Sequence, residues 1–135
     1  MERVEQTPSR ALDAERAVLG ALLIDETITS QILAEVDERD FSSNAFRLIF
    51  QAARAVFREG GHPDAVTING KLGYAAGSPQ QQQLIDLVDL TPTSASWREY
   101  AQLMHEQAAL GRIHALAAQI AGTPTMDEAR PLISE

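Results

Sequence analysis

Apolar residues recur at intervals of three and four along almost the whole chain, and this periodicity predicts a fold made of α-helices. An α-helix turns once every 3.6 residues, so such spacing places the apolar side chains of a segment on one face. The clearest stripe is formed by Phe46, Ile49, Phe50, Ala53, Val56 and Phe57. We therefore expect an all-α protein of about five short helices followed by one long helix.

Capping residues and chain breakers set the expected helix boundaries. Asp25 and Glu26 open a second helix, Ser43 or Asn44 is a candidate N-cap for a third, and Gly60-Gly61 ends that helix. Residues 1–8 carry no apolar stripe and are expected to form a frayed, mobile tail. The expected helices cover about 11–24, 26–36, 44–59, 66–74, 80–90 and 97–121.

The first and third helices are expected to form the hydrophobic core. Gly20 lies inside the first helix, although a glycine there costs about 1 kcal/mol relative to alanine. We interpret it as the point where another helix packs closely against the first. The side chains expected to be largely buried are Val18, Leu19, Leu22, Phe46, Ile49, Phe50, Val56 and Phe57.

The long last helix has an apolar face that changes partway along. Its base is expected to be anchored to the rest by Trp97, Tyr100, Ala101 and Met104. Beyond that base, apolar residues repeat every seven positions, which is typical of a seam for a second helix. We expect a dimer interface here, and the alternative is that these residues fold back onto the core. The candidate interface residues are Leu103, Leu110, Ile113, Ala117 and Ile120.

Charge and composition argue against direct reading of nucleic acid. The 135 residues include 11 basic and 19 acidic side chains, for a net charge of −8. Affinity for phosphate backbones comes mainly from Lys and Arg, so DNA is expected to bind weakly or not at all. No apolar run reaches the roughly 18 residues that span a bilayer, and no signal peptide is recognisable. A cytoplasmic protein with no membrane contact is expected, and the absence of cysteine excludes thiol chemistry.

Two candidate catalytic patterns fail on residue type. The segment Ala65–Leu72 partly matches the phosphate-binding pattern G-x-x-x-x-G-K-[ST], but Ala65 replaces its first glycine and Leu72 its magnesium-binding hydroxyl residue. Asp86 and Asp89 can share a helix face, yet no neighbouring histidine or glycine-rich loop completes an acid–base site. We expect both aspartates to lie on a solvated face.

The three histidines do not form a metal site. His105 and His114 are nine residues apart on one helix, which places them on opposite faces. His62 stands alone in a turn, so solvated histidines are expected. The sequence also lacks the G-x-S-x-G pattern of a serine nucleophile. No catalytic, cofactor-binding or metal-binding residues are therefore predicted in this chain.

Several short sequence motifs resemble those in the N-terminal domain of bacterial replicative DNA helicases, the DnaB family. The run DAERAVLGALLID at 13–25 is similar to the family's E-A-E-x-x-V-L-G-x-x-L, with Asp13 in place of the first glutamate. Further matches follow in the family's order. They are Asp40-Phe41, Arg47 with Ile49 and Phe50, the turn Gly61, Pro63, Asp64 and Thr67, then Thr91-Pro92, Tyr100-Ala101 and Arg112. Phe46 stands where the family usually has histidine.

The resemblance implies a head and a helical hairpin. Residues 9–122 correspond to the family's N-terminal domain, with the head at 9–93 and the first hairpin arm at 94–122. Residues 123–135 are expected to be the truncated start of the second arm. In the family these domains pair through their hairpins, and three pairs form a collar that binds primase and helicase-loading factors. ATP and magnesium belong to a separate ATPase domain with Walker motifs, which this sequence lacks.

Two other functions remain open from the sequence. The chain can be a free-standing helical regulator of a replicative helicase, which an in-frame Walker motif downstream of Glu135 would exclude. It can also be a small helical enzyme or ligand-binding protein, which ATP turnover by the chain itself would favour. The first interpretation, a non-catalytic assembly domain, fits the acidic charge and the missing P-loop best.

Overall fold

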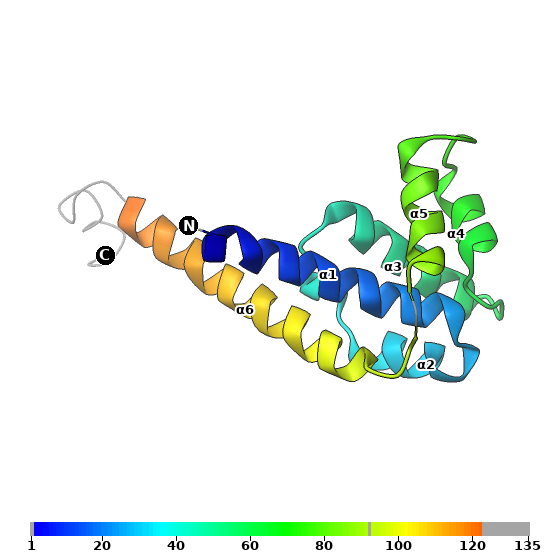
Figure 1. The fold of residues 1–135 in the computed structure, drawn as a ribbon, viewed down its shortest axis with the longest axis horizontal. Helices are drawn as coiled ribbons and strands as arrows, with labels where there is room; N and C mark the ends of the chain where they lie inside the picture. The colour runs from blue at the N-terminus through cyan, green and yellow to red at the C-terminus, as the bar shows by residue number, and fades with distance from the viewer. Residues whose placement is uncertain (1, 92, 123–135) are drawn as a thin grey trace, which may run out of the picture.

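The part of the chain that the structure describes folds into six α-helices and one short 3-10 helix, as a computed structural model shows (Figure 1). The structure describes residues 2–91 and 93–122, and the side chains of 10–91 and 93–121. No strand occurs within these ranges, which confirms the predicted all-α class. The elements are α1 (Glu2–Ile24), α2 (Glu26–Glu35), η1 (Glu38–Asp40), α3 (Asn44–Arg58), α4 (Ala65–Leu72), α5 (Pro79–Asp89) and α6 (Trp97–Gly122).

Polar N-cap residues fix where four of the helices start. Asp25, Ser43, Asp64 and Ser78 each accept a hydrogen bond from a backbone N–H in the first turn of α2, α3, α4 and α5. Such caps satisfy N–H groups that have no partner within the helix. Asp64 also forms a reciprocal capping box with Thr67, which explains why so short a helix as α4 is stable there.

Helix α1 begins earlier than the apolar pattern predicts. It starts at Glu2 rather than near Ala11, so the expected start of this helix is wrong. The mobility expected of residues 1–8 stays a prediction. Glutamate, arginine and glutamine in this stretch favour helix even without an apolar stripe. Residue 1 and the expected start of a second hairpin arm, 123–135, lie outside the described residues.

The core forms where α1 is surrounded by the other helices. In Figure 1, α1 and α6 run side by side in opposite directions, and α4 with α5 stands at the far end of the molecule. Seven of the eight side chains predicted to be buried are at most 5% exposed, namely Val18, Leu19, Leu22, Phe46, Ile49, Phe50 and Val56. Phe41 packs on Phe50 with ring centroids 5.0 Å apart.

Two apolar residues are more exposed than expected. Phe57, predicted in the core, is 42% exposed, and Tyr100, predicted in the anchor of the last helix, is 41% exposed. Phe57 continues the apolar stripe of α3 in its last turn, but its ring is only partly covered, whereas the adjacent Val56 is 5% exposed. The expected anchor of α6 therefore consists of Trp97 and Met104, which are buried, with Ala101 partly buried beside them.

Gly20 makes the close helix contact that the sequence predicts. A Cβ atom at this position would lie 1.8 Å from Thr91 Oγ1 and 2.7 Å from the carbonyl oxygen of Leu87. Real Cβ atoms do not approach other heavy atoms this closely, so only glycine fits. The C-terminal end of α5 thus rests directly on the backbone of α1.

Candidate functional site: the surfaces of the long helix

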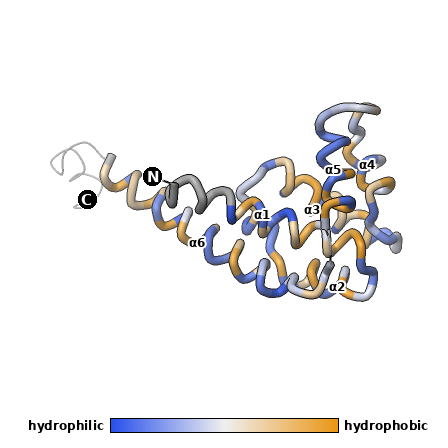
Figure 2. The backbone as a smooth tube through the Cα atoms, in the orientation of Figure 1, coloured by the Kyte–Doolittle hydropathy of each residue, from blue (hydrophilic) through white to orange (hydrophobic). Residues whose placement is uncertain are grey.

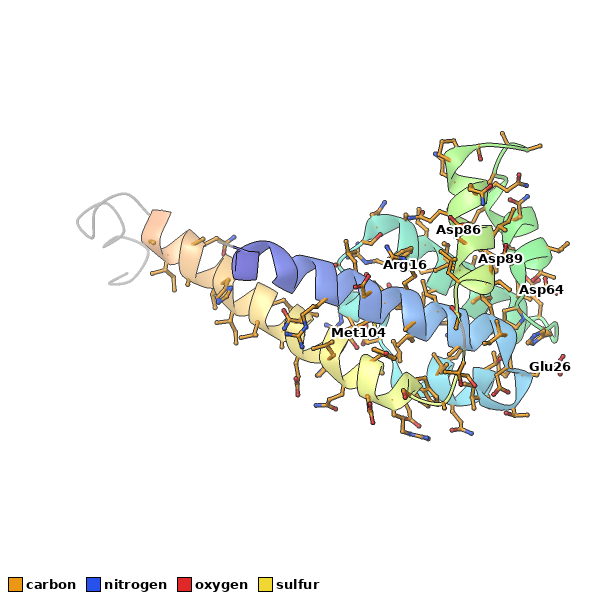
Figure 3. The ribbon with its side chains drawn as sticks, viewed as in Figure 1. Arg16, Glu26, Asp64, Asp86, Asp89 and Met104 are labelled. Carbon is orange, nitrogen blue, oxygen red and sulfur yellow. The ribbon has the colours of Figure 1, made fainter. Side chains whose placement is uncertain are left out.

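Helix α6 passes from the core into solvent along its length. Met104 lies where α6 runs beside α1 (Figure 3), and it is 1% exposed. From Leu110 to Ala121 every residue of α6 is exposed. Figure 2 shows apolar residues continuing into this exposed half. The second half of α6 therefore presents apolar side chains that its own head does not cover.

The predicted interface residues divide into two groups. Leu103 is partly buried and packs against the core, so it does not belong to an exposed seam. The other four are exposed. Leu116 is exposed too, but it was not predicted, because it lies one helical turn after Ile113 and outside the seven-residue repeat. We name the exposed set the α6 strip: Leu110, Ile113, Leu116, Ala117 and Ile120, with exposures of 46%, 60%, 58% and 67% for the four large residues.

The strip faces away from α1. At about 100° per residue, the large aliphatic residues gather on one side of α6, roughly opposite the face that continues from Met104. Beyond Met104, the middle of that second face carries the small residues Ala108, Gly111 and Ala115, with Gln107 and Arg112 at its edges. A helix normally buries its larger apolar side chains. The reversed arrangement of α6 leaves its most apolar face without a partner in the described structure.

A groove lies on the small-residue face, between α1, α6 and the segment around η1. Its volume is about 710 Å³. We name it the α1–α6 groove. It is lined by Ala11, Glu15, Glu38, Arg39, Asp40, Phe41, Ser42, Arg47, Met104, Gln107, Ala108, Gly111, Arg112 and Ala115. Sequence reasoning missed this groove, because its walls come from three segments far apart in the chain.

Glu15 ties α1 to the start of α3 beside the groove. It is 1% exposed, and its carboxylate accepts hydrogen bonds from the Ser42 N–H at 2.9 Å, the Ser42 hydroxyl at 2.6 Å and the Ser43 N–H at 3.2 Å. A buried carboxylate is tolerated only when such donors surround it. Glu15 is thus a structural link and not a free acid–base group.

Asp40 links η1 to α6. Its side chain is 7% exposed, and one carboxylate oxygen lies 2.9 Å from Nδ1 of His105. The other accepts a hydrogen bond from the Asp37 N–H at 3.3 Å. The His105 side chain is 58% exposed, as expected of a solvated histidine, but its ring is also held by a residue 65 positions away in the sequence. His114 is exposed and shares no site with it.

The remaining candidate residues form no catalytic constellation. Asp86 accepts a hydrogen bond from Gln82 Nε2 at 2.9 Å, and Asp89 is exposed on the same helix (Figure 3). His62 Nε2 lies 4.0 Å from a carboxylate oxygen of Glu26. Within 2–91 and 93–122, no three or more His, Asp or Glu residues are placed to hold a metal ion. Nor is any helix in this part long and apolar enough to cross a membrane.

Hydrogen bonds shift the pKa of two carboxylates. The Thr27 hydroxyl, the Ser94 hydroxyl and the Thr27 N–H lower the pKa of Asp25 below its ordinary value of 3.8. The Arg39 N–H and guanidinium lower the pKa of Asp37 in the same way. The Ser94 bond, 2.8 Å long, joins the α5–α6 connection to the start of α2. The Asp37 shift arises from the neighbouring Arg39, whereas the Asp25 shift depends also on the distant Ser94; both carboxylates serve as N-caps.

Most of the residues that carry the family resemblance have structural roles. Val18 and Leu19 lie in the core, Gly20 admits α5, and Glu15 bonds to Ser42 and Ser43. Arg47 Nη2 donates a hydrogen bond of 2.7 Å to the carbonyl oxygen of Phe41. The resemblance therefore describes the way the head is held together, and it points to surfaces rather than to a reaction centre.

Comparison with known proteins identifies the family. The family model "DnaB-like helicase N terminal domain" matches residues 7–106. The replicative DNA helicase DnaB of Geobacillus stearothermophilus is 32% identical over 139 residues, which cover 97% of this chain and 30% of the relative. DnaB of Mycobacterium leprae is 30% identical over 112 residues, covering 78% of this chain and 18% of the relative. The chain thus spans less than a third of these relatives.

A solved structure shows the same fold. The crystal structure of the N-terminal domain of DnaB helicase from Mycobacterium tuberculosis superposes with a TM-score of 0.75, at 24% identity, and the match covers 87% of this chain and 86% of the other. The chain belongs to the family of DnaB-like helicase N-terminal domains.

Proposed function

We propose that this chain is a non-catalytic collar domain, through which the subunits of a replicative DNA helicase assemble. The observation that carries the proposal is the α6 strip, which leaves four large aliphatic side chains about half or more exposed on one helix face. Contiguous apolar patches of this kind mark association sites in most soluble proteins. A second copy of the chain offers an identical strip, so the two can pair about a twofold axis.

The curated relatives support the wider setting of this proposal. They are replicative DNA helicases, and the matched region is a fraction of their length. In the parent protein, the collar would stabilise a ring of subunits as a trimer of dimers and bind primase and a helicase loader. Unwinding, ATP and magnesium would belong to the separate ATPase domain, in the cytoplasm. The net charge of −8 favours protein partners over DNA for the collar itself.

Analytical ultracentrifugation of the chain and of Ile113→Glu over a concentration series tests the proposal. Ile113 is 60% exposed, so the domain should still fold with glutamate at this position. In a paired strip the same glutamate would be buried against apolar residues, and two copies would face each other. We expect the unaltered chain to form a weak, concentration-dependent dimer and Ile113→Glu to remain monomeric.

Val66→Glu provides a matched control. Val66 is 80% exposed on α4, far from the strip, so the same kind of charge is introduced on another helix. It should leave dimerisation unchanged. If the unaltered chain stays monomeric at the highest concentration, or if both variants behave alike, the strip is not a dimer interface. Unfolding of Ile113→Glu alone would show instead that Ile113 is part of the core.

A further inference from the structure

The α1–α6 groove differs from the strip in position and in chemistry. It lies on the other side of α6, and its apolar floor is made of small side chains together with Met104 and Phe41. Along α6 it extends from Met104 to Ala115, which is about 16 Å or three helical turns. Small residues let the backbone of an incoming helix approach to about 8 Å, the short end of helix packing distances.

The carboxylates of the groove have hydrogen-bond or ion-pair partners within the protein, whereas its arginines have fewer. Its carboxylates are engaged within the fold: Glu15 by Ser42 and Ser43, Asp40 by His105, and Glu38 by Arg54 at 3.1 Å. These carboxylates therefore offer little to a ligand. The groove's acceptor groups are used by the protein itself.

The arginines of the groove are less occupied. Arg39 is paired with Asp37, and Arg47 uses one guanidinium nitrogen on the Phe41 carbonyl oxygen. Among the described residues, Arg112 makes no hydrogen bond or ion pair and is exposed. A guanidinium has five N–H donors and pairs best with a carboxylate. In a chain with a net charge of −8, an apolar groove edged by available arginine donors selects an acidic partner.

We propose that the α1–α6 groove binds an amphipathic helix of another protein, which places small or aliphatic side chains on the groove floor and a carboxylate on Arg112. This is recognition of a helix in a groove, with apolar anchors at i, i+3, i+4 and i+7. The site is independent of pairing through the α6 strip, because the two occupy different faces of α6. The groove and the strip can be occupied at the same time.

Fluorescence anisotropy with a designed probe tests the proposal. The probe is a labelled amphipathic peptide of about 16 residues, a little more than four helical turns, with alanine and leucine on one face and glutamate flanking it. The comparison probe has glutamine in place of each glutamate. We expect saturable binding of the acidic probe with a Kd below about 1 mM, and at least tenfold weaker binding of the glutamine probe.

Two variants and two matched controls locate the site. Gly111→Leu fills the groove, and Gly70→Leu makes the same change in α4. No atom lies within 4 Å of a Cβ at either glycine, so both variants should fold. Arg112→Gln removes the free guanidinium, whereas Arg58→Gln removes an exposed one on α3. Gly111→Leu and Arg112→Gln should each weaken probe binding about tenfold or more, and the controls should not.

Each of the other results overturns the proposal. No saturable binding by the folded chain, equal binding of the two probes, or equal effects of variants and controls would remove the acidic helix as the occupant. If Gly111→Leu abolishes self-association in sedimentation while no probe binds, the occupant is a second copy of this chain. Weaker probe binding by Ile113→Glu would also contradict the proposal, because Ile113 lies on the α6 strip and does not line the groove.

Discussion

Gly20→Ala is expected to destabilise the protein, although alanine is the better helix former. The new methyl group would lie 1.8 Å from Thr91 Oγ1, and 2.7 Å from both Thr91 Cβ and the Leu87 carbonyl oxygen. Rotation of the Thr91 side chain can relieve the first contact but not the other two, which involve a Cβ atom and the backbone. The end of α5 must therefore move away from α1.

The size of the effect follows from three contributions. Forcing an extra methyl group into a packed contact costs about 1–3 kcal/mol. Moving Thr91 disturbs its hydroxyl's hydrogen bond to the Leu87 carbonyl oxygen, which stabilises by about 1 kcal/mol. Alanine recovers about 1 kcal/mol of helix propensity. The net loss is about 2 kcal/mol, which corresponds to a Tm lower by roughly 8 °C in a domain of this size.

Denaturant and thermal unfolding followed by circular dichroism measure this loss. Gly111→Ala is the control, because no atom lies within 4 Å of a Cβ there and the same substitution should stabilise by up to about 1 kcal/mol. Thr91→Gly removes two of the three close contacts, so it should partly restore the stability of Gly20→Ala beyond additivity. If Gly20→Ala is as stable as the unaltered chain, α5 does not rest on the α1 backbone as described.

Three further predictions concern the core, the buried carboxylate and pH. Phe50→Ala should cost about 3–5 kcal/mol in urea unfolding, because the ring is fully buried, whereas Phe57→Ala should cost less than about 1 kcal/mol. Glu15→Ala should cost about 3 kcal/mol, since it leaves the N–H donors of Ser42 and Ser43 without an acceptor. Asp13→Ala, which removes an exposed ion pair, should cost less than about 1 kcal/mol. Equal losses would show that the Glu15 hydrogen bonds do not stabilise the fold. The pKa of Asp25 is lowered in the folded state, so its stabilisation is present above 3.8 and is lost as pH falls through the lower folded value. Asp25→Asn should therefore flatten the dependence of unfolding free energy on pH below pH 3.8, and an unchanged slope would refute this.

Local signals in the sequence predicted the helices well, because each depends on neighbouring residues only. Ser43 was one of two candidate N-caps, and it is the one that accepts the Phe46 N–H. Gly20 was interpretable because a glycine inside a helix has a cost that packing must offset. Caps and helix-internal glycines can be interpreted from the residues within one or two helical turns of them.

Burial and long-range polar contacts were not predictable in the same way. Phe57 continues the apolar stripe of α3, yet its exposure depends on where other helices stop. The pairing of Asp40 with His105 joins residues 65 positions apart. Neither residue type nor spacing indicates that contact. The α6 strip was largely predictable because it is a property of one helix, whereas the α1–α6 groove requires three segments to meet.

The antiparallel pairing of α1 with α6 has a consequence for the order in which the protein folds. Helix α1, which is synthesised before the other described helices, contributes Val18, Leu19 and Leu22 to the core, and these remain without part of their packing until Trp97 and Met104 have been synthesised. Contacts between distant segments form late, because a long loop must close first. Nascent chains that end before Trp97 should thus expose apolar surface and recruit chaperones, and protection from protease should appear abruptly once Met104 emerges from the ribosome.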